Sequence, residues 1–155
     1  MEKTGKVIEI ISAVLDIRFN EDELPEIYEE VIVESDHAKV TAEVAQDLGD
    51  HIVRCIALGS TDGLKRGDKA VAMGHPIMVP VGDETLGRIF NVLGDTIDNK
   101  GPVATKARKP IHRKPPEFRD QVTGMEMLET GIKVVDLLCP YLKGGKTGLF
   151  GGAGV

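Results

Sequence analysis

The chain has 155 residues, a hydrophobic fraction of 41%, a charged fraction of 28% and a net charge of −6, which is typical of a soluble globular protein with a substantial core. The negative charge and the aromatic content of 4%, without tryptophan, disfavour a protein that binds nucleic acid through its overall field or through stacking platforms. No apolar stretch approaches the roughly 18 residues of a membrane-spanning helix and no secretory signal is visible, so we expect membrane association only through partner proteins.

Residues 1–80 have the pattern of a small all-β domain. Runs rich in β-branched residues alternate with turn signals. These runs span residues 7–19, 28–34, 39–45, 52–58 and 77–81. Short strands at this spacing predict a small closed barrel, in which no sheet edge stays exposed. Residues 61–68, which contain two glycines and two aspartates, are expected to separate two barrel strands.

From residue 81 the pattern changes. Glycines interrupt an apolar stretch, and residues 103–120, rich in proline, lysine and arginine, predict an extended strap on a surface. Thr130 resembles an N-cap of a helix over residues 132–138, which Pro140 helps to end. Residues 146–150 predict a buried strand that leads into a glycine-rich turn. The fold class is therefore β followed by α/β, with the α/β part incomplete.

The last five residues have the spacing of a phosphate-binding loop. That loop has a glycine, four further residues and then Gly-Lys-Ser or Gly-Lys-Thr. Its first five positions are matched by Gly151, Gly152, Ala153, Gly154 and Val155. In such a loop successive backbone N–H groups point into one concavity and bind phosphate oxygens, and glycine lets the phosphate approach the backbone.

Several blocks in the right order and spacing resemble the catalytic β subunits of F-type ATP synthases. The matching stretches are Gly5-Lys6-Val7, Ile52-Val53-Arg54, Pro80-Val81-Gly82, residues 85–94 (TLGRIFNVLG), Ile111-His112-Arg113, residues 128–137 (LETGIKVVDL), residues 143–146 (KGGK) and residues 148–155 (GLFGGAGV). The non-catalytic α subunits share Leu86-Gly87-Arg88 and Asn91. The assignment to β therefore depends on the small spacer in the phosphate loop and on Ile111-His112-Arg113.

The resemblance implies a six-stranded N-terminal β-barrel domain over residues 1–80. It implies the beginning of a RecA-like P-loop nucleotide-binding domain over residues 81–155, as in an N-terminal fragment that ends inside the loop. The partners it implies are α subunits in an alternating hexameric ring and the γ subunit of the central stalk. The subunit would then be a peripheral membrane protein on the cytoplasmic face of the cell membrane, or on the matrix or stroma side in an organelle.

The resemblance further implies ATP synthesis from ADP and phosphate by rotary catalysis, driven by a transmembrane proton or sodium gradient. The cofactor would be ATP or ADP with Mg²⁺, bound by Gly151, Gly152, Ala153, Gly154 and Val155. No residue is assigned as catalytic. The phosphate-contacting lysine, the Mg²⁺-binding hydroxyl and the water-orienting carboxylate of such sites would follow Val155. We therefore expect the 155-residue chain alone to be inactive.

Other reactive side chains have simpler interpretations. The four histidines, His37, His51, His75 and His112, lack ligand spacing, so we predict no metal site. His75 is expected in a turn, and His112 is expected to anchor the strap through hydrogen bonds. Asp136 and the acidic residues of segment 21–30 are interpreted as solvated charges, and Cys55 and Cys139 as buried free thiols. The basic residues of segment 106–114 are interpreted as a solvated or subunit-facing strap, because no aromatic residues separate them.

Two alternatives stay open. The chain would be a non-catalytic barrel assembly module of a hexameric ring if the protein ended at Val155. A related RecA-type ATPase, such as a flagellar-export or vacuolar-type motor, is disfavoured by the whole-length match. In either case, a strand at residues 146–150 without neighbouring strands cannot bury its faces. We therefore expect residues beyond about 81 to be poorly packed in the isolated chain.

Overall fold

The computed structural model describes residues 3–36, 38–121 and 124–154. The chain divides into two compact units, Met1–Arg113 and Lys114–Val155. The first unit contains a β-barrel followed by a long loop, and the second contains one short helix and a two-stranded sheet. None of the helices in the described residues has the length and apolar character needed to cross a membrane.

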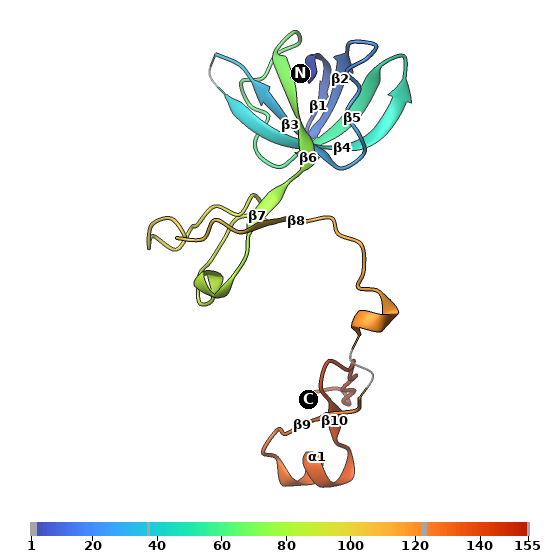
Figure 1. Ribbon diagram of the computed structural model, residues 1–155, viewed down its shortest axis with the longest axis vertical. Helices are drawn as coiled ribbons and strands as arrows, with labels where there is room; N and C mark the ends of the chain where they lie inside the picture. The colour runs from blue at the N-terminus through green and yellow to red at the C-terminus, as the bar shows by residue number, and fades with distance from the viewer. Residues whose placement is uncertain (1–2, 37, 122–123, 155) are drawn as a thin grey trace. The chain divides into compact units, whose positions relative to one another are not determined.

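Six antiparallel strands form the closed barrel of the first unit (Figure 1). They are β1 (Lys3–Ile11), β2 (Val14–Phe19), β3 (Glu29–Glu34), β4 (Lys39–Gly49), β5 (Ile52–Ala57) and β6 (Lys69–Pro76). Their order around the barrel is β1-β2-β5-β4-β3-β6, so β6 pairs with both β3 and β1 and closes the sheet. The predicted six-stranded barrel is confirmed, and residues 61–68 do separate two of its strands.

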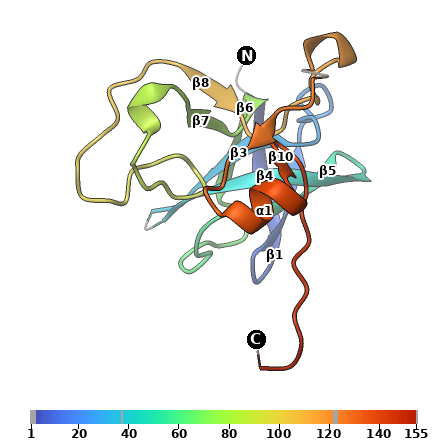
Figure 2. The ribbon, with the colours of Figure 1, turned by 90° about the horizontal axis from the view of Figure 1, so that it is seen from below.

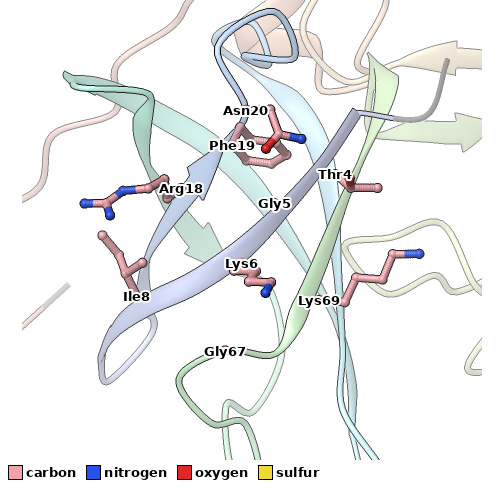
Figure 3. Close-up of a pocket in the computed structure, with 9 residues that line it drawn as sticks. All are labelled: Thr4, Gly5, Lys6, Ile8, Arg18, Phe19, Asn20, Gly67 and Lys69. Atoms are coloured by element: carbon pink, nitrogen blue, oxygen red, sulfur yellow. The ribbon is translucent and has the colours of Figure 1, made fainter.

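The barrel core follows from the alternation of the strands. In β3 the alternating residues Val31 and Val33 are fully buried, while Ile32 and Glu34 face outward. The buried cluster is mostly aliphatic and consists of Val7, Leu15, Ile17, Phe19, Val31, Val33, Val40, Ala42, Val44, Val53, Cys55, Ala57, Ala70 and Ala72. Gly5 lets β1 approach β2, because a Cβ there would lie 2.8 Å from the carbonyl oxygen of Arg18. The outer face of β1, β2 and β6 is hollowed into a pocket of about 580 Å³ (Figure 3).

Two carboxylates are buried in the barrel wall. Asp16 accepts two hydrogen bonds of 2.8 Å from the guanidinium of Arg54 on β5. Glu29, 4% exposed, accepts hydrogen bonds from Lys3 Nζ and from the backbone N–H groups of Glu26 and Gly74. Glu29 therefore connects β1, β3 and β6. The interpretation of this residue as part of a solvated acidic loop is wrong.

The rest of the first unit follows Ile77, a buried residue just beyond the barrel strands. The short strand β7 (Met78–Pro80) pairs antiparallel with β8 (Arg108–Pro110), as Figures 1 and 2 show. The 3₁₀ helix η1 (Asp83–Thr85) lies in the loop between these two strands. The predicted barrel strand at residues 77–81 is therefore wrong, because the sixth barrel strand is β6.

The second unit contains little regular structure. The 3₁₀ helix η2 (Phe118–Asp120) precedes β9 (Met127–Leu128), α1 (Lys133–Leu138) and β10 (Tyr141–Leu142), and β9 pairs antiparallel with β10. After β10 the chain runs as an extended trace (Figure 2). The predicted strand at residues 146–150 is wrong, because these residues are neither paired nor buried. Among the described residues of this unit there is no parallel sheet, so the predicted RecA-like domain is not formed here.

Candidate functional site

The glycine-rich segment of residues 151–154 is exposed and forms a turn at its end. Gly154 has a φ of +88°, which favours glycine because other residues rarely adopt that region. A Cβ added at Gly152 or Gly154 would meet open space. Within the described residues, the backbone N–H groups of 151–154 donate no hydrogen bond, so they are available to an anion. Val155, the fifth predicted phosphate-binding residue, lies outside the described residues.

The described residues around this segment are exposed as well. Phe150 before it is 98% exposed and Leu149 is 81% exposed. Among the described residues, none within hydrogen-bond distance supplies a lysine, hydroxyl or carboxylate to residues 151–154. The segment therefore has the backbone chemistry of a phosphate loop without the side chains needed for phosphoryl transfer.

A hydrogen-bonded network organises the turn before α1. Asp136 Oδ1 accepts hydrogen bonds from the Thr130 hydroxyl at 2.6 Å and the Thr130 backbone N–H at 3.0 Å, and Oδ2 accepts one from the Gly131 N–H at 2.9 Å. These bonds favour the ionised form, and the Thr130 hydroxyl contributes most to lowering the pKa of Asp136. The interpretation of Asp136 as a solvated charge is therefore wrong.

The cap of α1 also differs from the prediction. The helix begins at Lys133, and the cap position belongs to Ile132 rather than to Thr130. The Thr130 hydroxyl still accepts a hydrogen bond from the Ile132 N–H, at 3.1 Å. Asp136 satisfies the two N–H groups upstream, so the helix carries its own capping carboxylate. In the sequence, the signal for this capping carboxylate is the pair Thr130-Gly131 followed by Asp136, six residues after the threonine.

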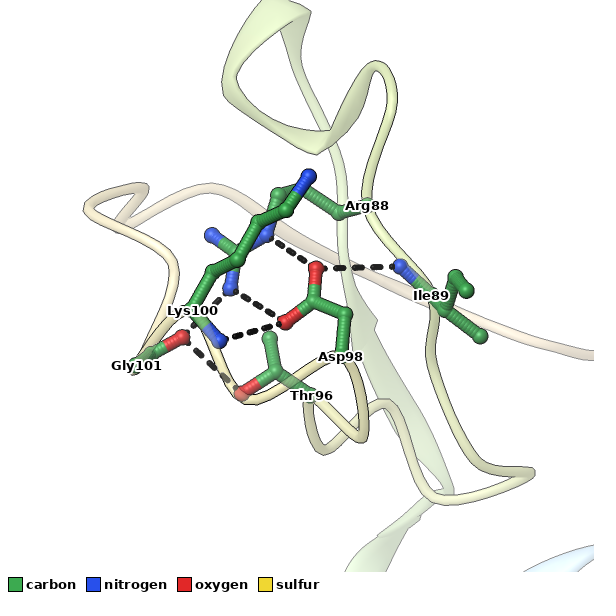
Figure 4. Close-up of polar contacts among 6 residues, drawn as sticks. All are labelled: Arg88, Ile89, Thr96, Asp98, Lys100 and Gly101. Atoms are coloured by element: carbon green, nitrogen blue, oxygen red, sulfur yellow. Dashed lines mark hydrogen bonds and ion pairs between the residues drawn. The ribbon is translucent and has the colours of Figure 1, made fainter.

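A second network fixes the loop between β7 and β8. Arg88 Nε lies 2.6 Å from Asp98 Oδ2, and the guanidinium also donates to Asp98 Oδ1 and to the carbonyl of Gly101 (Figure 4). Asp98 further accepts from the N–H groups of Ile89 and Lys100. The side chains of Arg88 and Asp98 are only 15% and 4% exposed. The hydrogen bond from Arg88 is the largest cause that lowers the pKa of Asp98 well below its usual range.

The strap after β8 is anchored on the barrel by His112. Its Nε2 lies 2.8 Å from Oε2 of Glu43 on β4. Its ring stacks on Tyr28, with centroids 4.1 Å apart. Tyr28 has a φ of +70°, unusual for a bulky residue, and its N–H donates to the Val44 carbonyl. The expected anchoring role of His112 is confirmed.

The other predicted residues are scattered. His75 lies at the end of β6 rather than in a turn, and His37 lies outside the described residues. Groups of three or more possible metal ligands do not occur in the described part of the chain. Cys55 is buried as expected, and burial raises the pKa of its thiol to about 12, whereas Cys139 is exposed and that half of the prediction is wrong. The basic residues of segment 106–114 are exposed.

The barrel matches a known family of domains. The family model described as ATP synthase alpha/beta family, beta-barrel domain, matches residues 7–74. These residues run from Val7 in β1 to Gly74 in β6 and include parts of all six strands of the closed sheet. The description covers alpha and beta subunits alike. Residues 7–74 of this chain are therefore similar to the β-barrel domain of the ATP synthase alpha/beta family.

Proposed function

We propose that the chain is the N-terminal part of a catalytic β subunit of an F-type ATP synthase. Such a subunit makes ATP from ADP and phosphate by rotary catalysis, using a transmembrane proton or sodium gradient. The observation that carries the proposal is the family match over residues 7–74, which coincides with the closed barrel. The small residues of the spacer at 152–155 favour a catalytic over a non-catalytic subunit.

In this proposal the barrel serves to assemble the subunit into a ring. It joins α subunits in an alternating hexameric ring around a central stalk that contains γ. The subunit is then peripheral to the membrane, on the cytoplasmic face or on the matrix or stroma side, and reaches it through other subunits. The barrel suits such a role because its core is closed and independent of the residues that follow.

In this proposal the nucleotide binds at the glycine-rich segment. The N–H groups of Gly151, Gly152, Ala153, Gly154 and Val155 would bind phosphate oxygens of ATP or ADP with its Mg²⁺. The open space at Gly152 and Gly154 fits close approach of a phosphate. A site limited to backbone amides does not transfer a phosphoryl group, so we expect the 155 residues alone neither to make nor to hydrolyse ATP.

A second candidate is a non-catalytic assembly module of a hexameric ring. One observation favours it: the buried hydrophobic cluster of the described residues is confined to the barrel. The module would occupy a position in the ring without binding nucleotide.

The sequence of the transcript beyond the codon for Val155 decides between the two. A following Gly-Lys-Thr or Gly-Lys-Ser completes the phosphate loop and supports the catalytic subunit, whereas a stop codon supports the module. The completed subunit should then bind fluorescent Mg²⁺–ADP. Replacement Gly154→Ala should weaken that binding by about tenfold, because a strained left-handed alanine costs roughly 1–2 kcal/mol. Gly124→Ala, at an open glycine outside the glycine-rich segment and without a positive φ, is the control.

A further inference from the structure

A single row of charged side chains crosses five neighbouring strands of the barrel. The register places Lys6 of β1 opposite Arg18 of β2 and opposite Lys69 of β6. Lys69 lies opposite Glu34 of β3, and Glu34 lies opposite Lys39 of β4. We call these five residues the basic row. Four of them are cations and one is an anion, in a chain with a net charge of −6.

The row faces solvent because its members alternate with core residues. Lys6, Arg18 and Lys69 are exposed, while their strand neighbours Val7, Phe19 and Ala70 are buried. Within the described residues, none of these three cations makes an ion pair or a side-chain hydrogen bond. The one carboxylate of the row is already engaged, with Glu34 Oε1 2.8 Å from Lys39 Nζ. The hydrogen bond from Lys39 is the main cause that lowers the pKa of Glu34, and Lys69 contributes only a weaker Coulombic effect.

The three consecutive cations oppose barrel stability. Directly opposed side chains on neighbouring strands are about 4.5–5.5 Å apart at Cβ, and like charges at that position destabilise the pairing. Lys6 has such a neighbour on each side. The barrel therefore carries an electrostatic cost that an anionic ligand would remove.

The same three cations line the pocket of about 580 Å³ on this face. Its lining also includes the apolar side chain of Ile8 and the amide of Asn20. Figure 3 shows the Arg18 guanidinium beside Ile8, with Lys69 on the other side of β1. The pocket therefore combines separated positive charges with an apolar wall.

We propose that this face binds an acidic segment of a partner protein. Carboxylates spaced along an extended segment can reach all three cations, whereas a single small anion would reach only one or two exposed groups. The aromatic ring in the lining, Phe19, is buried, so bases of a nucleic acid have no platform on which to stack. A second copy of this chain is a weaker occupant, because Glu23 and Glu29 in its most acidic segment already bind donors within their own barrel.

The proposal concerns the barrel alone and goes beyond the nucleotide chemistry proposed above. It is tested with the full 155-residue chain and a fluorescein-labelled peptide of the sequence of residues 20–30, which contains six carboxylates. The control peptide replaces all six with amides. The test variant is Lys6→Gln with Lys69→Gln, and the matched variant is Lys133→Gln with Lys146→Gln, which removes the same charge from exposed lysines of the second unit.

We expect the acidic peptide to bind and the amide peptide not to bind. The row variant should weaken binding about tenfold, as expected for two exposed charge pairs at the upper end of their range. About 0.5 M salt should abolish binding, because it screens exposed charges. The matched variant should bind as the wild type does. The melting temperature of the row variant should equal or exceed that of the wild type, which shows that it folds.

Other results would overturn the proposal. If the row variant and the matched variant bound the acidic peptide equally well, the peptide would bind at a site other than the basic row. Tighter binding of polyuridylate than of the peptide, lost in the row variant, would make the face a nucleic-acid site. If sedimentation equilibrium shows that the wild type is a dimer and the row variant a monomer, the occupant of this face would be a second copy of the chain rather than a partner protein.

Discussion

Three carboxylates show how much of this structure depends on single residues. Asp16, Glu29 and Asp136 each bind donors supplied by other segments: a guanidinium, an ammonium with two amides, and a hydroxyl with two amides. In the sequence Asp16 and Asp136 lie between apolar residues, whereas Glu29 lies in an acidic segment. For Asp16 and Glu29, nothing in the spacing indicates the donors on distant strands. The roles of Asp16 and Glu29 could not be predicted because Arg54, Lys3 and Gly74 come close to them only on folding.

The two cysteines provide a prediction at this scale. Iodoacetamide at pH 8 should modify Cys139 rapidly and Cys55 only after unfolding, since Cys55 is buried and its thiol pKa is raised to about 12. The unfolded thiol has a pKa of about 8.5, so the native state holds its proton more tightly. The protonated Cys55 thiol therefore stabilises the folded chain fully below the unfolded pKa, and this stabilisation is lost as pH rises towards the folded pKa. Mass spectrometry of the alkylated peptides checks this, and rapid native labelling of Cys55 would contradict it.

The Asp136 network gives a pH-dependent prediction. The pKa of Asp136 is lowered in the folded chain, chiefly by the Thr130 hydroxyl. Its contribution to stability is therefore complete above the unfolded pKa of about 3.9 and is lost as pH falls through the lower folded value. The NMR amide signals of Thr130 and Gly131 should shift with a midpoint below 3.8, the ordinary value of an aspartate. That transition should be absent in Asp136→Asn.

A neighbouring carboxylate provides the control for this experiment. Glu129→Gln removes an exposed charge next to Thr130 and should leave the transition unchanged. Equal transitions in the wild type and in Asp136→Asn would mean that another group causes the shift.

At the scale of elements, His112 anchors the strap on the barrel. His112→Ala removes both the contact to Glu43 and the stacking on Tyr28. Local opening should increase, and trypsin should cleave the native protein after Arg113 roughly three- to tenfold faster. Timed digestion followed by mass spectrometry measures this rate. His112→Phe, which retains a stacking ring, should lie between wild type and His112→Ala, and identical rates for all three would show that the strap is held elsewhere.

The elements also show where sequence patterns succeed and fail. The barrel strands were predictable because β3, β4 and β5 are β-branched runs between clear turn signals. Residues 77–81 have the same pattern, yet β7 pairs with β8 outside the barrel. Whether a strand joins the barrel depends on the strand with which it pairs, and the sequence of one strand does not indicate that partner. The prediction of a strand at residues 146–150 was wrong for a related reason, because a strand is stable only where it pairs with another strand or packs on a core.

At the scale of the molecule, the structure divides into a packed barrel and a weakly packed second unit. Leu15 is fully buried and Leu149 is 81% exposed. We therefore expect Leu15→Ala to lower the free energy of unfolding by about 2–5 kcal/mol. The same substitution at Leu149 should change it by less than about 0.5 kcal/mol. Urea denaturation followed by circular dichroism measures both, and a large loss for Leu149→Ala would show that the second unit is folded more tightly than its burial indicates.

Of the candidate site, the sequence indicated the anchoring histidine, which is confirmed, and the glycine-rich segment, whose phosphate binding stays a prediction. It did not indicate the networks around Asp98 and Asp136. Glycine spacing and positive φ are local properties that a sequence can reveal. The environment of a phosphate loop is a tertiary property, and the described residues do not assemble it.

The strand order of the barrel also determines its response to mechanical load. The seam that closes the sheet joins residues 3–6 of β1 to residues 69–72 of β6, so the start of the barrel and its exit at Pro76 lie at the same end of one antiparallel ladder. Tension between the two ends would break the hydrogen bonds of that ladder one after another rather than all at once. We therefore expect the barrel to open first at this seam when it is pulled in this direction, and a neighbour that bridges β1 and β6 would resist the opening.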